Sequence, residues 1–163
     1  MKKLSKTAYE KFDLRRGVDF IGVNVVFFCH DGKGNILLHK RSAQCRDEQG
    51  KWDCGAGSME FGERFEEAVA REVGEEYGVK PLEIKYVTST SIVRDNKGTS
   101  THRIANLHVV RVDPKKVKNN DPKYIDDIGW FALDNMPSPL HPKFIENLPI
   151  VKKMIRKKKN GIS

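Results

Sequence analysis

The stretch Gly57–Val79 has the sequence GSMEFGERFEEAVAREVGEEYGV and combines a helix pattern with a helix stop. Apolar side chains recur three and four residues apart from Phe65 to Tyr77, which predicts an amphipathic helix with one face on a core. Gly78 follows directly, where a glycine commonly ends a helix in a left-handed conformation. The stretch therefore predicts a loop that leads into one packed helix.

Three glutamates crowd one face of this predicted helix. Glu72 and Glu76 are four residues apart, and Glu75 lies three residues after Glu72, so the three carboxylates are neighbours. Like charges at this spacing repel each other. A hard divalent cation, Mg²⁺ or Mn²⁺, would neutralise them and would serve phosphoryl or pyrophosphoryl chemistry. An ordinary solvated acidic face also explains the glutamates, but it does not explain the glycines and Arg71 at their positions.

The same stretch carries fixed residue types at fixed spacing: Gly57, Glu63, Arg71, Glu72, Val73, Glu75, Glu76, Gly78 and Val79. This pattern resembles the Nudix box, the signature of the Nudix (MutT-type) hydrolases, and every defining position is filled. The order of predicted elements supports the resemblance from about residue 19 to residue 133. It implies an α/β fold, an α/β/α sandwich around a mixed β-sheet, and hydrolysis of a nucleoside diphosphate linked to another moiety.

The resemblance also implies roles for single residues. Arg71 would orient a metal-binding glutamate and pair with Glu63, a pair that supports the loop and helix together with Gly78. Glu60 would be an outer ligand or a proton acceptor, or else a solvated loop carboxylate. The mechanism would be attack of a metal-activated water on a phosphorus of the diphosphate. The implied metal ligands are Glu72, Glu75, Glu76 and the backbone carbonyl of Gly57.

One position departs from the family pattern. The family often has Pro-Gly-Gly before the loop, where this chain has Gly55-Ala56-Gly57. An alanine at the middle position requires a backbone conformation that tolerates a Cβ atom. The departure concerns the geometry of the loop and leaves the expected role of the carboxylates unchanged.

The remaining sequence predicts a single domain, with a core at about 19–155 and a basic tail at 156–163. β-branched and aromatic runs predict strands, Gly55–Gly57 is expected to be a loop, and a helix is expected from Phe144 onward. Pro149 is expected to break or restart that helix. The predicted strands lie at residues 19–29, 35–41, 51–54, 82–93, 101–112 and 128–133.

The substrate is expected to contact residues outside the box. The segment YIDDIGWF, residues 124–131, resembles a segment of the oxidised-purine triphosphatases. The resemblance implies that Asp126 and Asp127 hydrogen-bond a purine edge and that Tyr124 lies against the base. Two alternatives stay open for the aspartates, a solvated or salt-bridged loop acid and a general base. Arg41, at the end of a predicted strand, is a candidate donor to a substrate phosphate.

Several substrate classes remain open at this stage. A (deoxy)nucleoside triphosphate, oxidised or not, is the leading expectation, and ADP-ribose or a nucleotide sugar is the alternative. The basic ends of the chain motivate an RNA-binding or RNA 5′-end-processing protein, although no RNP-like aromatic platform or helix-turn-helix pattern is visible. A catalytically inactive binding module is a further alternative, against which the intact box argues.

Composition narrows the cellular setting. No apolar run approaches the roughly 18 residues of a membrane span, and no apolar region follows the N-terminal lysines, so neither a membrane protein nor a secreted one is expected. Three cysteines without CxxC spacing suit a reducing cytoplasm. A formal net charge of +8 would attract phosphate-bearing ligands. We expect a cytoplasmic monomer or homodimer with a small nucleotide as substrate.

Overall fold

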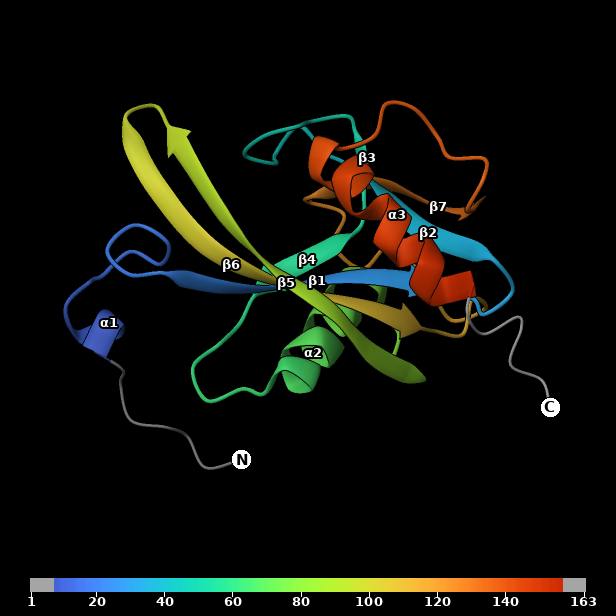
Figure 1. Ribbon diagram of the computed structural model, residues 1–163, viewed down its shortest axis with the longest axis horizontal. Coiled ribbons are helices and arrows are strands. Elements are labelled where there is room, and N and C mark those ends of the chain that lie inside the picture. The colour runs from blue at the N-terminus through green and yellow to red at the C-terminus, as the bar shows by residue number, and fades with distance from the viewer. Residues whose placement is uncertain (1–7, 157–163) are drawn as a thin grey trace.

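The structure is a computed structural model that describes residues 8–156 (Figure 1). Apart from Arg156, the predicted basic tail lies outside the described residues. In chain order the elements are α1 (Ala8–Lys11), β1 (Gly22–His30), β2 (Asn35–Arg41), β3 (Trp52–Asp53), β4 (Gly55–Ser58), α2 (Phe65–Tyr77), β5 (Glu83–Asn96), β6 (Thr99–Arg111), β7 (Ile125–Ala132) and α3 (Pro142–Arg156).

The strands form one mixed sheet, as predicted. β1 and β6 run parallel at its centre, paired from Gly22–Arg103 to His30–Arg111. The other pairs are antiparallel: β5 with β6, β4 with β1, and β2 with β1, β3 and β7. The hairpin of β5 and β6 extends as a long arm away from α3 (Figure 1).

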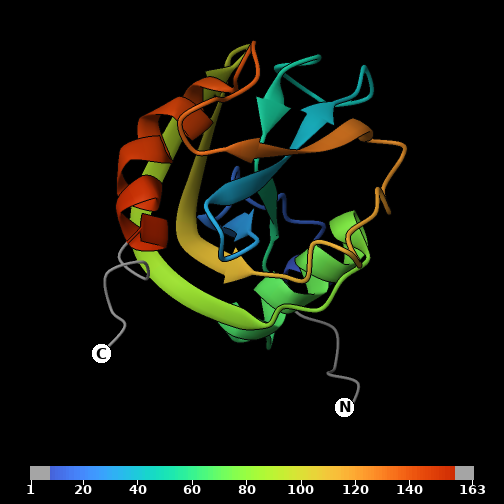
Figure 2. The ribbon, with the colours of Figure 1, turned by 90° about the vertical axis from the view of Figure 1, so that its right-hand side faces the viewer.

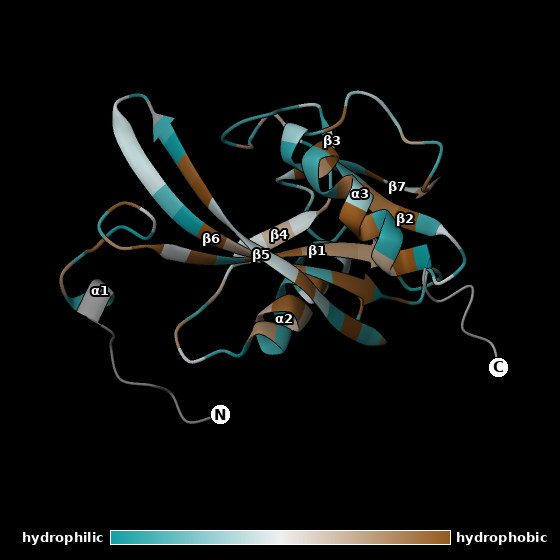
Figure 3. Ribbon diagram, viewed as in Figure 1, coloured by the Kyte–Doolittle hydropathy of each residue, from teal (hydrophilic) through white to brown (hydrophobic). Residues whose placement is uncertain are grey.

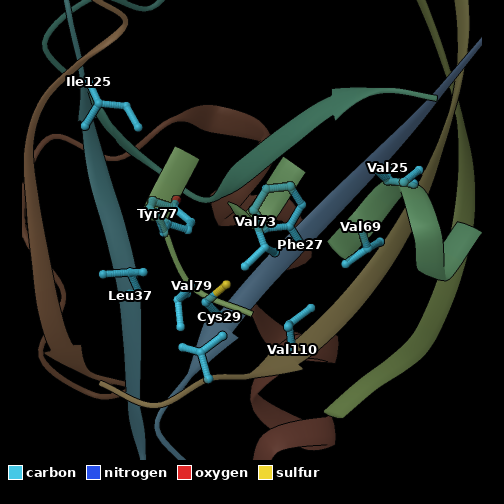
Figure 4. Close-up of a cluster of buried hydrophobic side chains, with 12 residues drawn as sticks. Val25, Phe27, Cys29, Leu37, Val69, Val73, Tyr77, Val79, Val110 and Ile125 are labelled. Carbon is cyan, nitrogen blue, oxygen red and sulfur yellow. The ribbon is translucent and has the colours of Figure 1, made fainter. Parts of the chain in front are cut away.

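Two helices cover opposite faces of the sheet (Figure 2), which confirms the sandwich. β1 contributes side chains to both faces of the sheet, because successive side chains of a strand point to opposite faces. Its Phe27 faces α2, where its ring packs edge-on against Tyr77 with centroids 6.1 Å apart. The neighbouring Phe28 faces α3, where its ring lies 5.9 Å from that of Phe144. Figure 4 shows the cluster under α2, which includes Val25, Phe27, Cys29, Val69, Val73 and Tyr77.

Both helices are amphipathic, with hydrophobic and hydrophilic residues interleaved along them (Figure 3). In α2 the buried residues are Ala68, Val69, Val73 and Tyr77. Within residues 8–156, no helix is long and apolar enough to cross a membrane. Cys29, Cys45 and Cys54 are all free thiols.

The expected break at Pro149 is wrong, because α3 is one helix from Pro142 to Arg156. Proline removes one backbone hydrogen bond from a helix interior. The buried side chains of Phe144, Val151 and Ile155 lie on both sides of the proline and hold both halves of the helix on the sheet.

Two further boundaries differ from the sequence expectation. Residues 55–58 form strand β4 rather than a loop, because their backbone pairs with β1 from Phe27–Gly55 to Asn24–Ser58. β7 begins at Ile125, so Asp126 and Asp127 lie within a strand that pairs with β2 and not in the loop before it.

Candidate functional site

Helix α2 presents its glutamates because its other face is fixed in the core. The backbone N–H of Arg64 donates to Glu67 Oε2 at 2.8 Å and closes the first turn. Gly78 ends the helix with φ of 63°, and its N–H donates to Gly74 O. This is the left-handed stop that the sequence predicted. Val73, on the core side, is fully buried, which turns the glutamates toward β4.

Arg71 ties the helix to the loop that precedes it. Its Nε and Nη2 donate to the two carboxylate oxygens of Glu63 at 2.7 and 3.0 Å, and Nη2 also donates to the carbonyl of Ser58 at 3.0 Å. Its Nη1 donates to Glu72 Oε1 at 2.8 Å. The expected ion pair between Arg71 and Glu63 is therefore present, and the same guanidinium holds Glu72. Hydrogen bonds from Arg71 and the backbone N–H of Glu60 lower the pKa of Glu63.

Glu72 lies directly against the backbone of Gly57. A Cβ atom at position 57 would be 1.9 Å from the carboxyl carbon of Glu72, far inside van der Waals contact. Only glycine lets this backbone and carboxylate approach so closely. Ala56 beside it is in strand β4 with an exposed side chain and negative φ, which explains why the departure from the family pattern is tolerated.

Glu76 is a buried carboxylate with an unpaired oxygen. Its Oε1 accepts the backbone N–H of Ala56 at 3.3 Å, whereas its Oε2 has no hydrogen-bond partner within the described part of the chain. Burial raises the pKa of Glu76 well above its usual value. His39 Nδ1 lies 3.8 Å from this oxygen, but it hydrogen-bonds Tyr77 Oη at 2.7 Å. Burial lowers the pKa of His39 to about 3, so the imidazole is neutral.

The glutamates open onto a first cavity of about 310 Å³. Arg41 and Tyr124, two of the predicted substrate-binding residues, also line it. Arg41 donates to the carboxylate of Asp47 at 2.8 Å and to that of Asp53 at 3.4 Å. The residues that line this cavity are His39, Arg41, Cys45, Arg46, Asp53, Cys54, Ala56, Glu72, Glu75, Glu76, Asp121, Tyr124 and Ile125.

A second cavity of about 270 Å³ lies between the strands and α3. Its walls include aliphatic and aromatic side chains, among them Ile92, Leu107 and Phe144, and cations such as Arg94 and Lys143. Such a mixture of apolar walls and a few polar groups is typical of small-molecule sites.

Three predicted substrate-binding residues lie outside both cavities. Asp126 and Asp127 are exposed on β7, and the carboxylate of Asp127 accepts the N–H of Ile128 at 2.8 Å. Glu60 is exposed on the loop before α2. The structure thus brings Arg41 and Tyr124 to the glutamates, but not these three acids.

The residues present fit a divalent cation. Glu76 offers a buried oxygen that lacks a partner, and Glu72 lies beside it with a largely buried side chain; burial raises the pKa of Glu72. Within residues 8–156, no three His, Cys, Asp or Glu side chains already stand in a geometry that holds a metal ion. Mg²⁺ needs few protein carboxylates, because water and substrate phosphates complete its coordination. In this structure the carboxylate of Glu72 accepts a hydrogen bond from Arg71.

Several cavity residues were not predicted from the sequence. His39, Asp53 and Asp121 belong to different elements or loops, and no local pattern distinguishes them from ordinary polar residues. Only the pairing of β2 with β3 and β7 brings their segments together.

Known proteins share this architecture. The crystal structure of the MutT NUDIX hydrolase from Burkholderia pseudomallei is similar with a TM-score of 0.71 and 26% sequence identity, covering 81% of this chain and 98% of that one. The NUDIX domain of Shewanella oneidensis NrtR, solved with ADP ribose, has a TM-score of 0.65 at 16% identity and covers 91% and 94% of the two chains. The second likeness shows the fold alone.

Sequence relatives add a second line of comparison. The NAD-capped RNA hydrolase NudC of Citrobacter koseri is 34% identical over 103 residues, which are 63% of this chain and 36% of that protein. The chain thus spans little more than a third of the length of the curated relatives it matches. The NUDIX domain model matches residues 20–154 of the 163. The chain therefore belongs to the NUDIX domain family.

Proposed function

We propose that this chain is a Nudix pyrophosphohydrolase, which cleaves the phosphoanhydride of a nucleoside diphosphate linked to another group with Mg²⁺ or Mn²⁺. One observation carries the proposal: the unpaired, buried oxygen of Glu76 lies beside Glu72 at a cavity that also exposes Arg41 and Tyr124. A buried carboxylate oxygen without a partner makes the charged form of Glu76 costly unless a cation occupies the site.

The side chains of α2 and the backbone of Gly57 would have different roles according to their positions. Glu72, Glu75 and Glu76, with the carbonyl of Gly57, would hold the cation, which when bound activates water and offsets charge on the phosphates. Arg71 would keep Glu72 aimed at the cation through its Nη1–Oε1 hydrogen bond.

Two residues on the cavity wall would act on the substrate itself. Arg41, fixed by Asp47 and Asp53, would donate to a phosphate oxygen. Tyr124 is 42% exposed, and Lys123 Nζ lies 4.8 Å from the centroid of its ring. The part of the ring that lines the cavity would contact the ligand.

Among the substrate classes, we propose dinucleotide-like diphosphates such as ADP-ribose or NAD ahead of triphosphates. The triphosphate expectation was based on the small size of the chain and on the segment from Tyr124 to Trp130, of which Tyr124 lines the first cavity and the two aspartates line neither. Two cavities on either side of the Asp53 region offer room for a group at each end of a diphosphate. The curated relatives are named for hydrolysis of NAD-capped RNA, and a fold neighbour was solved with ADP ribose. These names support the class of dinucleotide-like substrates, and they describe the ligands of those other proteins.

A product-resolved screen tests the proposal. Purified protein is incubated with ADP-ribose, NAD, nucleotide sugars, nucleoside triphosphates and NAD-capped RNA, each with Mg²⁺, with Mn²⁺ and with a chelator. We expect cleavage between the two phosphorus atoms of ADP-ribose or NAD, and none with the chelator. Turnover of triphosphates alone would reverse the order of the two classes. No turnover of any compound would refute the enzymatic function.

We further propose that the chain acts as a single catalytic domain in the cytoplasm. Free thiols at Cys29, Cys45 and Cys54 suit a reducing compartment.

A further inference from the structure

The two cavities share one wall. Each has a volume of about 300 Å³, the lower end of the range for small-molecule sites. A nucleoside diphosphate that carries a further group would not fit in one cavity of this size. It would therefore extend from one cavity across the shared wall into the other. The residues that line both cavities are Arg41, Arg46, Asp53, Cys54 and Ala56.

The two cavities differ in chemistry. The first holds the carboxylates of Glu72, Glu75 and Glu76 and suits the diphosphate with its cation. The second contains Ile92 and Leu107 and suits a flat, largely apolar ring. In any nucleotide the ribose lies between the base and the phosphates. A base in the second cavity and phosphates in the first therefore place the ribose at the shared wall.

Dinucleotide-like substrates also place a ribose at the shared wall. In ADP-ribose and NAD, a ribose is attached to each end of the diphosphate. Whichever half enters the second cavity, its ribose passes the wall. The placement thus holds for both orientations of NAD, for ADP-ribose bound by its adenosine half and for a nucleoside triphosphate.

Asp53 is the one carboxylate on the shared wall, and it is buried. Its Oδ1 accepts the N–H of Cys54 at 2.8 Å, and its Oδ2 lies 3.4 Å from Arg41 Nη1 and 3.9 Å from His141 Nε2. His141 Nδ1 accepts the N–H of Lys143 at 3.0 Å, so Nε2 carries the imidazole proton and points to Asp53. The side chain of Cys54 also hydrogen-bonds this carboxylate. A carboxylate offers about four acceptor positions, and the contacts to Oδ2 from Arg41 and His141 are long. Asp53 thus keeps free acceptor capacity toward the ligand.

We propose that Asp53 accepts hydrogen bonds from the ribose hydroxyls of the substrate, so that the site selects ribonucleotides over 2′-deoxyribonucleotides. The inference deepens the proposed function and depends on it for the order of phosphates, ribose and base. Arg41 and His141 act as positioning residues that orient the carboxylate from two sides.

A purely structural role for Asp53 predicts something different. If the carboxylate only held Arg41 and the start of α3, its replacement would lower stability and affect ribo- and deoxynucleotides equally. Selection between the two sugars is the readout that separates these roles.

Binding without turnover is the direct test. Calorimetry measures the affinity of the wild-type protein, with Ca²⁺ in place of Mg²⁺ as the oxygen-bound cation, for matched pairs of ribo- and 2′-deoxynucleoside diphosphates of each base, and for ADP against 3′-deoxy-ADP. We expect at least about tenfold tighter binding of the ribonucleotide for the preferred base, the value of one hydrogen bond to a charged acceptor. Equal affinities, or no measurable binding of either member of every pair, would overturn the inference.

Variants locate the selection. Asp53→Asn keeps the shape of the side chain but removes its charge, and we expect the ribo-to-deoxy ratio to fall to within about threefold of unity. Glu66→Gln, which removes an exposed acid of α2 that lines neither cavity, should leave the ratio at its wild-type value. An unchanged ratio in a folded Asp53→Asn protein, judged by thermal melting, would assign the selection elsewhere. If that variant does not fold, equal affinities of the wild type for ADP, 2′-deoxy-ADP and 3′-deoxy-ADP would still overturn the inference.

Failure of the two proposals can be told apart. Selective binding of ribonucleotides without hydrolysis of any compound would refute the enzymatic function and leave the role of Asp53 standing. Metal-dependent hydrolysis with equal kcat/KM for ribo- and deoxyribonucleotides would support the enzymatic function and refute the role of Asp53.

Discussion

The carboxyl carbon of Glu72 occupies the space that any side chain at Gly57 would need, because a Cβ atom there would lie 1.9 Å away. Gly57, which opens the Nudix box, and Glu72, the first of the three clustered glutamates of α2, thus form one contact. The spacing of these residues in the sequence follows from this contact between β4 and α2.

Gly57→Ala should therefore displace Glu72 while the fold remains. A displacement of about 1 Å in a catalytic group can cost about 100-fold in rate, and we expect a loss of that order in kcat/KM. The matched control is Gly74→Ala within α2, where an added Cβ has nothing within 4 Å. That variant should keep activity and gain about 0.5–1 kcal/mol of stability, since alanine favours a helix over glycine. Comparable activity losses in both variants would contradict the contact as the cause.

Glu76→Gln tests the cation site. The variant keeps the shape of the side chain and removes a buried charge, so turnover should fall by orders of magnitude while the metal-free protein melts at the same or a higher temperature. Mg²⁺ should raise the melting temperature of the wild type, because it binds the folded state, and should not raise that of the variant. Glu66→Gln, an exposed glutamate of the same helix, is the control. Near-normal turnover of Glu76→Gln at saturating Mg²⁺ would show that the carboxylate holds no metal.

Arg71→Lys tests whether Arg71 acts through geometry. A lysine cannot reach Glu63, Ser58 and Glu72 together as the planar guanidinium does. We expect lower kcat and about 1–3 kcal/mol less stability, measured by chemical denaturation.

The control for Arg71→Lys is Arg64→Lys. The ion pair of Arg64 with Glu67 is largely exposed, and such surface pairs contribute little. Unchanged kinetics and unchanged stability of Arg71→Lys would count against the positioning role.

The sequence predicts local features well where a pattern repeats within one element. The helix from Phe65 to Tyr77 and the stop at Gly78 follow from apolar spacing and one glycine, and both are present in the structure. The strand at 35–41 was also predicted with its boundaries. These features depend on neighbours in the chain, which a sequence displays directly.

Features that depend on distant segments were missed. β4 was expected to be a loop because glycine disfavours strands, yet pairing with β1 makes residues 55–58 a strand. Pro149 predicts a break that burial of α3 on the sheet overrides. Asp53 reaches the cavity wall because β3 pairs with β2, and the sequence around it carries no signal for that position.

The last prediction concerns residues 124–127, where the resemblance and the geometry disagree. Asp126 and Asp127 are exposed and line neither cavity. We therefore expect Asp126→Asn and Asp127→Asn to leave the preference among bases unchanged. Tyr124 lines the first cavity. If a base stacks on its ring, Tyr124→Ala should weaken the binding of every substrate by about 1–3 kcal/mol.

Rate constants on a panel of purine and pyrimidine nucleotides distinguish the roles left for the two aspartates. A changed base preference in either variant would show that the carboxylate hydrogen-bonds the base, as the resemblance implies, since an unpaired polar group penalises the wrong partner. An equal loss of turnover on every substrate, together with a shifted pH–rate profile, would identify a general base instead. Wild-type rates in both variants would leave Asp126 and Asp127 as solvated acids on β7, with Tyr124 as the residue of this segment that meets the substrate.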